Sequence, residues 1–370
     1  MLPCLSAHKC LAHMIYLIVF NASPENCEDT LYYFHCDIRE YFLKKGISCT
    51  DNLPSFVFGV LPDYLDKNLK IKKAFYFDKD DNLKKIKFDS SVKADIVHFL
   101  FLSPFEESRL HRFLSSSFQK KKIKMVNPYN KGILNCESKF RTYEILREND
   151  IPTPLCFKIS KFNKIRAEDL KEILKNIKSD GIFIQPECGT EGIDCRFFRK
   201  TDIEGIIEYI KNKTEDLIIR KRVGEQKFKN PPYSPFSKGG DGGDYLVLRI
   251  NVTYDGTYHA DSGYAVLGKE EVVSVTTGAE KKNINEVLDS FKKEEIDRIK
   301  KIACKAAEKI FRNNEPSLLV GVDMVLGEVP CVIDVNPRPV VVGSRIIGNN
   351  KISLGKNFGE GIVQRWNGGI

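Results

Sequence analysis

Several features that mark particular classes of protein are scarce or missing from this sequence. Its 11 cysteines include no CxxC pair and its 6 histidines show no metal-ligand spacing, which argues against the common zinc motifs and against a small disulfide-rich domain. No apolar run approaches the length of a membrane span. We therefore expect a cytoplasmic protein with reduced cysteines and no membrane partner.

Positive charge is not concentrated anywhere either. The net charge of +8 arises from Lys and Arg interspersed with Asp and Glu, without a long basic tract or an aromatic-rich groove pattern. A nucleic-acid partner is therefore not favoured, and anionic small molecules fit the charge equally well. With 42% hydrophobic residues among 370, the chain is long and apolar enough for two or three packed domains.

The first part of the chain alternates strand-like and helical patterns. Apolar runs such as "MIYLIVF", from Met14, and "ADIVHFLFL" are separated by helical periodicity, which predicts an α/β domain with a parallel sheet over residues 14–130. Residues 1–13 are expected to be a disordered extension, with Met14 as an alternative start. Further along, residues 293–312 have apolar side chains at helical spacing and predict an amphipathic helix.

Residues 229–244, "KNPPYSPFSKGGDGGD", interrupt the regular patterns that surround them. Pro, Gly, Ser and charged residues replace all periodicity, which predicts a low-complexity loop inserted between strands. A dispensable surface insertion is the preferred interpretation, because this composition cannot bury a core. A lid or a partner-binding loop is the alternative.

The stretch "GVDMVLGEVPCVIDVNPRP", from residue 321, predicts a β-hairpin whose apolar strands carry three polar residues. Side chains alternate along a strand, so Asp334 and Asn336 share one face, and a loop at residues 328–329 places Asp323 opposite Asp334. Two like charges at that spacing destabilise the pair, and a cation would remove the penalty. Carboxylate and amide oxygens suit Mg²⁺; a solvated polar face is the alternative.

In this order, the motifs resemble the ATP-grasp family, especially the glutathione-synthetase-like carboxylate:amine ligases, from about residue 135 to residue 344. The amphipathic helix, "GVDMVL", a turn and "VIDVNPRP" carry most of the likeness, and "DVNPRP" is also similar to the ending of archaeal-type tyramine:glutamate ligases. The resemblance implies an α/β fold that is α+β in its C-terminal part. An N-terminal α/β domain (14–130) would precede a two-subdomain ATP-grasp fold, with subdomains at 131–222 and 223–370.

The resemblance also implies roles for the polar residues of the hairpin. Asp323, Asp334 and Asn336 would be metal ligands for Mg²⁺, which bridges the phosphates of ATP, and Mn²⁺ could take the same ligands. Arg338 and Arg249 would be catalytic, because a guanidinium offers a planar fork of donors to the charged oxygens of an acyl phosphate.

Nucleotide contacts are implied in three further places. Lys139, at the start of a helix, would pair with phosphate oxygens, the loop "GTEG" would close over them, and the linker "RKRVGE" would hold adenine and ribose. The implied loop residues are Gly189, Thr190, Glu191 and Gly192. The implied linker residues are Arg220, Lys221, Arg222, Val223 and Glu225.

One position departs from the family pattern. In "IFIQP", Gln185 stands where such ligases have a nucleotide-binding lysine. Glutamine donates a hydrogen bond but carries no charge, so a charge-assisted contact worth roughly 1.5–3 kcal/mol is absent. A cation of the linker could replace it.

The sequence thus predicts an enzyme, an ATP- and Mg²⁺-dependent carboxylate:amine (or carboxylate:thiol) ligase. It would form an acyl phosphate and then an amide bond between small-molecule carboxylate and amine substrates. A catalytically silent ATP-grasp protein that binds nucleotide or acts as a scaffold is the alternative, motivated by Gln185 and by the insertion. A homodimer is compatible with the sequence.

Overall fold

The computed structural model describes residues 14–21, 27–47, 53–100, 107–161, 165–189, 192–223, 244–327, 329–349 and 351–370. The predicted extension at 1–13 and all of the predicted insertion except Asp244 lie outside these residues. The chain divides into two compact units. The first unit comprises residues 1–129, 340–342 and 355–370, and the second comprises residues 130–339 and 343–354.

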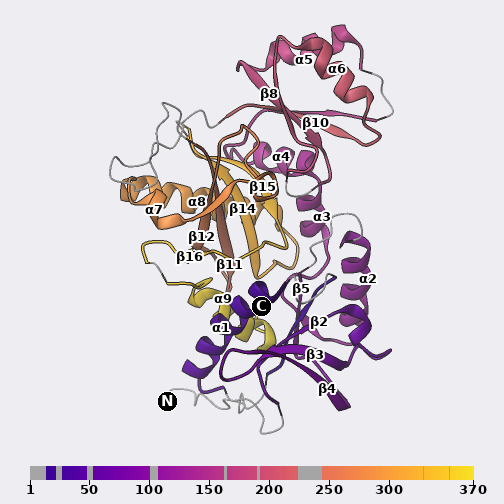
Figure 1. Ribbon diagram of the computed structural model, residues 1–370, viewed down its shortest axis with the longest axis vertical. Helices are drawn as coiled ribbons and strands as arrows, with labels where there is room; N and C mark the ends of the chain where they lie inside the picture. Colours follow the sequence, from indigo (N-terminus) through magenta and orange to yellow (C-terminus); the bar gives the residue numbers. More distant parts are fainter. Residues whose placement is uncertain are drawn as a thin grey trace, which may run out of the picture. The chain divides into compact units, whose positions relative to one another are not determined.

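The first unit is built on a sheet with the strand order β4-β3-β2-β1-β5-β6 (Figure 1). Strands β1, β2, β5 and β6 run parallel, which confirms the predicted parallel sheet, and β3 and β4 form an antiparallel edge. The strands are β1 (Tyr16–Val19), β2 (Val57–Val60), β3 (Ile71–Phe77), β4 (Leu83–Val92), β5 (Ile96–Phe99) and β6 (Lys124–Met125).

Helices cover both faces of this first sheet. On one face, Leu114 and Phe118 of α2 (Glu107–Lys120) share a core with Leu17. On the other face, Phe34 of α1 (Glu28–Lys44) stacks on Tyr16, with ring centroids 6.4 Å apart. All residues of β1, β2 and β5 are buried as a result, which explains why their sequences are continuous apolar runs.

The C-terminal helix α9 (Lys356–Asn367) belongs to the first unit, whereas the sequence prediction placed residues 223–370 in the second ATP-grasp subdomain. Phe358 packs against Phe34 of α1 with ring centroids 5.8 Å apart. The fully buried Arg365 donates from Nη1 to the backbone oxygen of Met125 at 2.9 Å. These contacts explain why the end of the chain packs with its beginning.

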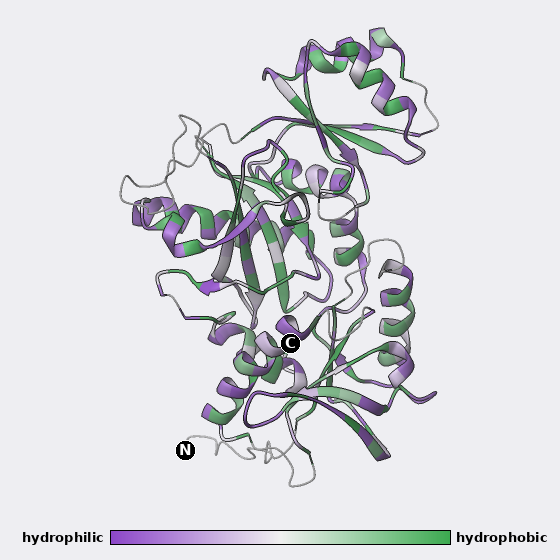
Figure 2. Cartoon of the chain, in the orientation of Figure 1, coloured by the Kyte–Doolittle hydropathy of each residue, from purple (hydrophilic) through white to green (hydrophobic). Residues whose placement is uncertain are grey.

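The second unit opens with α3 (Lys131–Glu137) and α4 (Lys139–Glu148), followed by a sheet of order β7-β10-β8-β9. Its strands, all antiparallel, are β7 (Cys156–Ile159), β8 (Gly181–Pro186), β9 (Arg196–Arg199) and β10 (Leu217–Lys221). Helices α5 (Ala167–Asn176) and α6 (Ile203–Lys211) cover one face, where Ile182, Ile184 and Ile219 are buried. Both helices are banded hydrophobic and hydrophilic in Figure 2, as amphipathic helices are.

A larger sheet follows, of order β13-β12-β11-β14-β15, with β16 beside β12. Its strands are β11 (Tyr245–Tyr254), β12 (Tyr258–Gly268), β13 (Glu280–Asn283), β14 (Leu319–Val325), β15 (Cys331–Asn336) and β16 (Arg345–Ile346). Helix α7 (Ile284–Leu288) precedes α8 (Lys293–Ile310), which confirms the predicted amphipathic helix. Helix α8 packs across β12, β11, β14 and β15, and so covers one face of this sheet.

Membrane-spanning segments were not expected from the sequence. Within the described parts of the chain, none of the helices combines the length and the apolarity needed to cross a bilayer.

Candidate active site

The hairpin of β14 and β15 has the predicted register at its polar residues. Asp323 lies directly opposite Asp334, and Gly321 lies opposite Asn336. The pairing then shifts by one residue beyond Asp323, which leaves these polar positions in register on one face. The predicted loop at residues 328–329 would place Met324 opposite Ile333, whereas Met324 pairs with Val332, so the predicted pairing next to the turn is wrong by one residue. A bulge that the sequence did not predict brings Asp323 opposite Asp334, while the period-2 pattern alone places Asp334 and Asn336 on one face.

The next strand supplies a cation that the sequence argument for the hairpin did not include. Arg249 of β11 lies opposite Asp323 and donates from Nε to Oδ1 and from Nη2 to Oδ2, the latter at 2.7 Å. Burial alone would lower the pKa of Arg249, but the charge and hydrogen bonds of Asp323, together with Tyr264 and Asp334, outweigh burial and hold that pKa above its usual range. The predicted repulsion between Asp323 and Asp334 is therefore corrected: a guanidinium already compensates one of the two charges.

Asp334 faces the N-terminus of α4. Its Oδ1 accepts from its neighbour Val335 N at 3.0 Å, and its Oδ2 lies 4.0 Å from Nζ of Lys139. Lys139 is the first residue of α4, only 8% exposed, and its ammonium also donates to the backbone oxygen of Gly189. The structure thus brings together the predicted phosphate lysine, the start of the predicted phosphate loop and the predicted metal hairpin.

The hairpin offers oxygen ligands that fit Mg²⁺. Among the described residues, no group of three or more His, Cys, Asp or Glu is arranged to hold a metal ion, so a site at the hairpin would add ligands of another kind, such as the amide of Asn336, to its carboxylates. Asn336 Oδ1 accepts one hydrogen bond, from the backbone N–H of Arg338 at 2.9 Å. A carboxylate has about four lone-pair positions, so Asp323 keeps acceptor capacity beside Arg249. Asp334 and Asn336, with Asp323 beside them, suit a hard cation that also keeps waters.

Arg338 lies just after the hairpin and is 9% exposed. Both of its terminal nitrogens lie 3.2 Å from Oε1 of Glu137, the last residue of α3. This ion pair holds the guanidinium at the end of β15. The predicted catalytic arginines therefore both have carboxylate partners, Glu137 for Arg338 and Asp323 for Arg249.

The face of the β8–β10 pair opposite the helices carries Gln185 and Arg220. Gln185, 9% exposed, pairs with Ile218, while Arg220 pairs with Phe183 one step along the same face. The guanidinium of Arg220, 8% exposed, donates from Nη1 to the backbone oxygen of Ile333 at 2.7 Å. Arg220 thereby connects the strand beside Gln185 to the hairpin that carries Asp334.

The other linker residues are arranged differently. Arg222 lies over the ring of Phe197, 5.1 Å from its centroid, and 3.3 Å from Asp180. Lys221 pairs with Ile182 and so alternates away from the face of Arg220. Val223 is partly buried, and Gly192 has a φ of 71°. Thr190, Glu191 and Glu225 lie outside the described residues.

The sequence argument missed three residues that join α4 to the end of β8. Glu187 accepts from Ser138 Oγ and from Lys158 Nζ, each at 2.5 Å. A charged residue directly after an apolar strand was the only local sign of this network. Its partners come from α4 and β7, whose placement beside β8 could not be read from one sequence.

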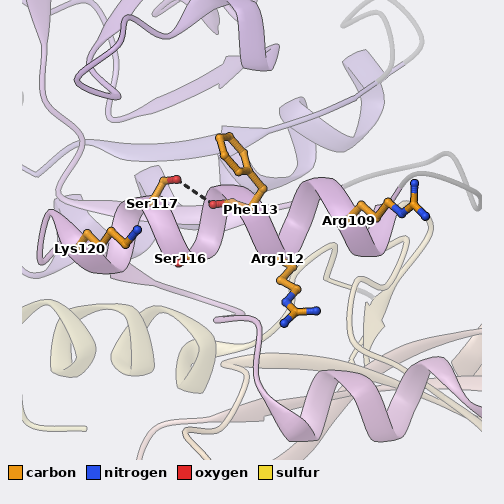
Figure 3. Close-up of a pocket in the computed structure, with 6 residues that line it drawn as sticks. All are labelled: Arg109, Arg112, Phe113, Ser116, Ser117 and Lys120. Atoms are coloured by element: carbon orange, nitrogen blue, oxygen red, sulfur yellow. Dashed lines mark hydrogen bonds between the residues drawn. The ribbon is translucent and has the colours of Figure 1, made fainter.

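A surface hollow in the first unit contains none of the predicted site residues. It runs along α2, as Figure 3 shows. Its lining residues are Arg109, Arg112, Phe113, Ser116, Ser117 and Lys120. All six residues belong to α2, so the hollow is a shallow depression on the surface of one helix and shares no residue with the predicted site.

Comparisons with known proteins give matches in structure alone. A scan against protein-family models finds no match, and neither does a search of curated proteins. The D-Ala:D-Ser ligase VanG from Enterococcus faecalis is similar with a TM-score of 0.60 and 13% identity, over 96% of this chain and 99% of that one.

Two further solved structures are similar. D-cycloserine synthetase DcsG has a TM-score of 0.56 and 11% identity, over 95% of this chain and 99% of that one. A D-alanine–D-alanine ligase from Bacillus anthracis, complexed with ATP, has a TM-score of 0.52 and 14% identity, over 89% of this chain and 87% of that one. At such identities the likeness establishes the fold, and the chain has the α/β architecture of these two ligases and the synthetase, in agreement with the predicted fold class.

Proposed function

We propose that this protein is an ATP- and Mg²⁺-dependent carboxylate:amine ligase. The observation that carries the proposal is the position of Lys139, whose ammonium lies between the backbone oxygen of Gly189 and the carboxylate of Asp334. Three motifs far apart in the sequence meet there. The fold supports the same conclusion, because the neighbours named above are ligases and one of them is complexed with ATP.

The charges at the site suit phosphoryl transfer. Lys139 and Arg220 are buried cations that each contact the hairpin, at Asp334 and at the backbone of Ile333, and they would bind the phosphates of ATP. Mg²⁺ held by Asp334, Asn336 and Asp323 would neutralise phosphate oxygens as charge develops on them. Cations fixed by ion pairs do not need to reorganise during the reaction, which favours the charged transition state.

The proposed reaction has two steps. A substrate carboxylate oxygen attacks the γ-phosphorus of ATP, the bond to the β–γ bridging oxygen breaks, and ADP leaves. An amine then attacks the carbonyl carbon of the acyl phosphate, inorganic phosphate leaves, and the amine loses a proton. Arg338 and Arg249 would stabilise the oxygens that gain charge in each step, because each guanidinium is already held in place by a carboxylate.

The substrates are proposed at the level of chemical class. The neighbours are named for joining amino acids or for making an amino-acid derivative, which makes small amino acids reasonable carboxylate and amine partners. Because "DVNPRP" is similar to the ending of tyramine:glutamate ligases, glutamate as the carboxylate and tyramine as the amine are further candidate substrates. A thiol acceptor remains the alternative to an amine.

A direct assay uses hydroxylamine, which traps acyl phosphates as hydroxamates. The protein would be given MgATP and a panel of carboxylates that includes D-alanine, D-serine and glutamate. We expect hydroxamate that depends on one carboxylate, that disappears in Asp334→Asn, and that persists in a control variant, Asp289→Asn, at an exposed position after α7.

A second candidate function is nucleotide binding without catalysis. Gln185 favours it, since the uncharged side chain faces the site beside Ile218. MgATP would then raise the melting temperature, as a ligand that binds only the folded state does, while no carboxylate gave hydroxamate. A protein that shows neither hydroxamate nor MgATP protection would contradict both candidates.

A further inference from the structure

Glu187 lies at the end of β8, two residues beyond Gln185, and is 8% exposed. Its Oε1 accepts from the hydroxyl of Ser138 at 2.5 Å. Ser138 is the N-cap of α4, where its own oxygen accepts from the backbone N–H of Arg141 at 3.0 Å. The carboxylate therefore fixes the hydroxyl that begins α4, the helix that carries Lys139.

The backbone of Glu187 makes a second connection to the same helix. The N–H of Lys139 donates to the Glu187 backbone oxygen at 3.1 Å, and the Glu187 N–H donates to the oxygen of Asp216 at 2.9 Å. The first residue of α4 is thereby hydrogen-bonded to the chain directly after β8. Because Lys139 also donates from Nζ to Gly189, both ends of that residue contact the segment 187–189.

The other oxygen of Glu187 is held by a cation. Lys158 Nζ, from β7, lies 2.5 Å from Glu187 Oε2 and 3.0 Å from Asp216 Oδ2. Burial of an unpaired carboxylate would be costly, and Lys158 removes most of that cost. Lys158 contacts no residue of α4 through these bonds, so the connection from the β7 cation to α4 passes through Glu187.

We propose that Glu187 is a positioning residue, which orders the first turn of α4 and so holds the ammonium of Lys139 between Gly189 and Asp334. The inference rests on the proposed function in that Lys139 is taken to bind the phosphates of ATP. Glu187 itself does not contact the nucleotide in this arrangement. Its carboxylate acts through Ser138 and through the position of the Lys139 backbone.

A double-mutant cycle tests this role. The dissociation constant of a non-hydrolysable ATP analogue with Mg²⁺ would be measured by titration calorimetry for Glu187→Gln, Lys139→Met and the double variant. A charge-assisted contact is worth roughly 1.5–3 kcal/mol, so we expect Lys139→Met to weaken binding about 10- to 100-fold. Glu187→Gln should weaken it about fivefold or more, and should add less than twofold in the Lys139→Met background.

Two further variants separate positioning from general stability. Asp216→Asn removes the other carboxylate partner of Lys158 without touching α4, and should change analogue affinity less than twofold. Ser138→Ala breaks the same link from the α4 side and should reproduce the loss seen in Glu187→Gln, which keeps the test valid if Glu187→Gln folds poorly. In a ligase assay, Glu187→Gln should raise KM for ATP and leave KM for the carboxylate unchanged.

A nucleotide-independent measurement distinguishes failure of this inference from failure of the proposed function. Labelling of Lys139 by an amine-acylating reagent, followed by mass spectrometry, should accelerate at least about threefold in Glu187→Gln and not in Asp216→Asn. Wild-type protein that binds no analogue would contradict the proposed function. Equal losses from Glu187→Gln with and without Lys139, or unchanged Lys139 labelling, would overturn the positioning role.

Discussion

The sheet of the first unit and the two sheets of the second unit differ in how many of their faces are covered by helices. In the first unit, β1, β2 and β5 are buried on both faces by α1 and α2. In the second unit, α5 and α6 cover one face of the smaller sheet and α8 covers one face of the larger sheet. The opposite faces carry charged side chains. A sheet buried on both faces presents apolar side chains to its helices, so charged residues are confined to its edges and ends, whereas a sheet covered on one face can carry them along its strands.

The buried ionisable groups of the two units differ in the same way. In the first unit, burial lowers the pKa of His35 to about 4 and that of His98 to about 3, so both are neutral near pH 7. In the second unit, Arg249 forms an ion pair with Asp323, while the buried Arg220 donates to the backbone oxygen of Ile333. Arg365 is an exception in the first unit, and it donates to a backbone oxygen. Among the described residues, buried charge is thus more frequent in the second unit, where most of it lies in ion pairs.

Arg249→Met gives the largest expected effect on stability. The substitution leaves Asp323, whose side chain is 15% exposed, opposite Asp334 without its guanidinium partner. Removing one partner of a buried pair costs about 3–5 kcal/mol, and we expect a loss near the lower value because the pair is partly exposed. Denaturant unfolding of the ligand-free protein would measure it.

The matched control for that loss is the double variant Arg249→Met/Asp323→Leu. With both charges replaced by apolar groups, most of the stability should return. A loss below about 1 kcal/mol in Arg249→Met would mean that the charged face of the larger sheet behaves as a solvated surface, contrary to the comparison drawn above.

Asp334→Asn should abolish most activity while changing stability little. Loss of a charged oxygen ligand should lower the hydroxamate rate at least about 100-fold, comparable to removal of a donor from an oxyanion hole. Stability of the ligand-free protein should change by less than about 1 kcal/mol, because Lys139 loses only a partly exposed ionic neighbour at 4.0 Å and Asp323 keeps its pair with Arg249. Chemical denaturation with and without MgATP would measure both effects.

Local patterns in the sequence were sufficient for much of this architecture. The pairing of Asp323 with Asp334 depends on a bulge that the sequence did not predict. By contrast, alternation of strands and helices predicted the parallel sheet, and the period-2 pattern of the hairpin placed Asp334 and Asn336 on one face. Both follow from residues close in sequence. Where the resemblance supplied candidate residues, Lys139 and Asp334 prove to be neighbours in the structure.

Pairings between distant elements could not be predicted. Arg249 and Asp323 are 74 residues apart and meet only because β11 is placed beside β14. Glu187 and Ser138 are 49 residues apart and meet only because the end of β8 lies at the start of α4. Strand order is set by the summed burial of many side chains, and one sequence does not reveal that sum.

Acid should destabilise the first unit through its buried histidines. The pKa of His98 is lowered to about 3 in the fold, against about 6.5 in the unfolded chain. Its contribution to stability is therefore fully present above about pH 6.5 and is lost as the pH falls toward 3. Between pH 7 and pH 5, the free energy of unfolding should fall by about 2 kcal/mol for His98 alone.

Denaturant titrations at the two pH values would measure this loss. His98→Gln keeps a partner for Tyr16, whose hydroxyl lies 2.7 Å from Nδ1 of His98, and should remove about that much of the pH dependence. An equal pH dependence in wild type and His98→Gln would contradict the assignment of acid sensitivity to the first unit.

The smallest expected effect comes from Gln185→Lys, which adds a cation to the charged face of the smaller sheet. The family resemblance implies a lysine at this position, but Arg220 already places a buried guanidinium one step along the same face. A second cation gains attraction to phosphate and also meets repulsion from Arg220, so we expect nucleotide affinity to rise only about threefold. Titration with a non-hydrolysable ATP analogue would measure the change.

Gln185→Met, which has similar size and no polar group, is the matched control and should bind no more tightly than wild type. In the background of Arg220→Gln the gain from Gln185→Lys should grow to about 10-fold or more, since the repulsion is gone and a charge is needed. A gain that is the same in both backgrounds would show that Arg220 does not serve the nucleotide.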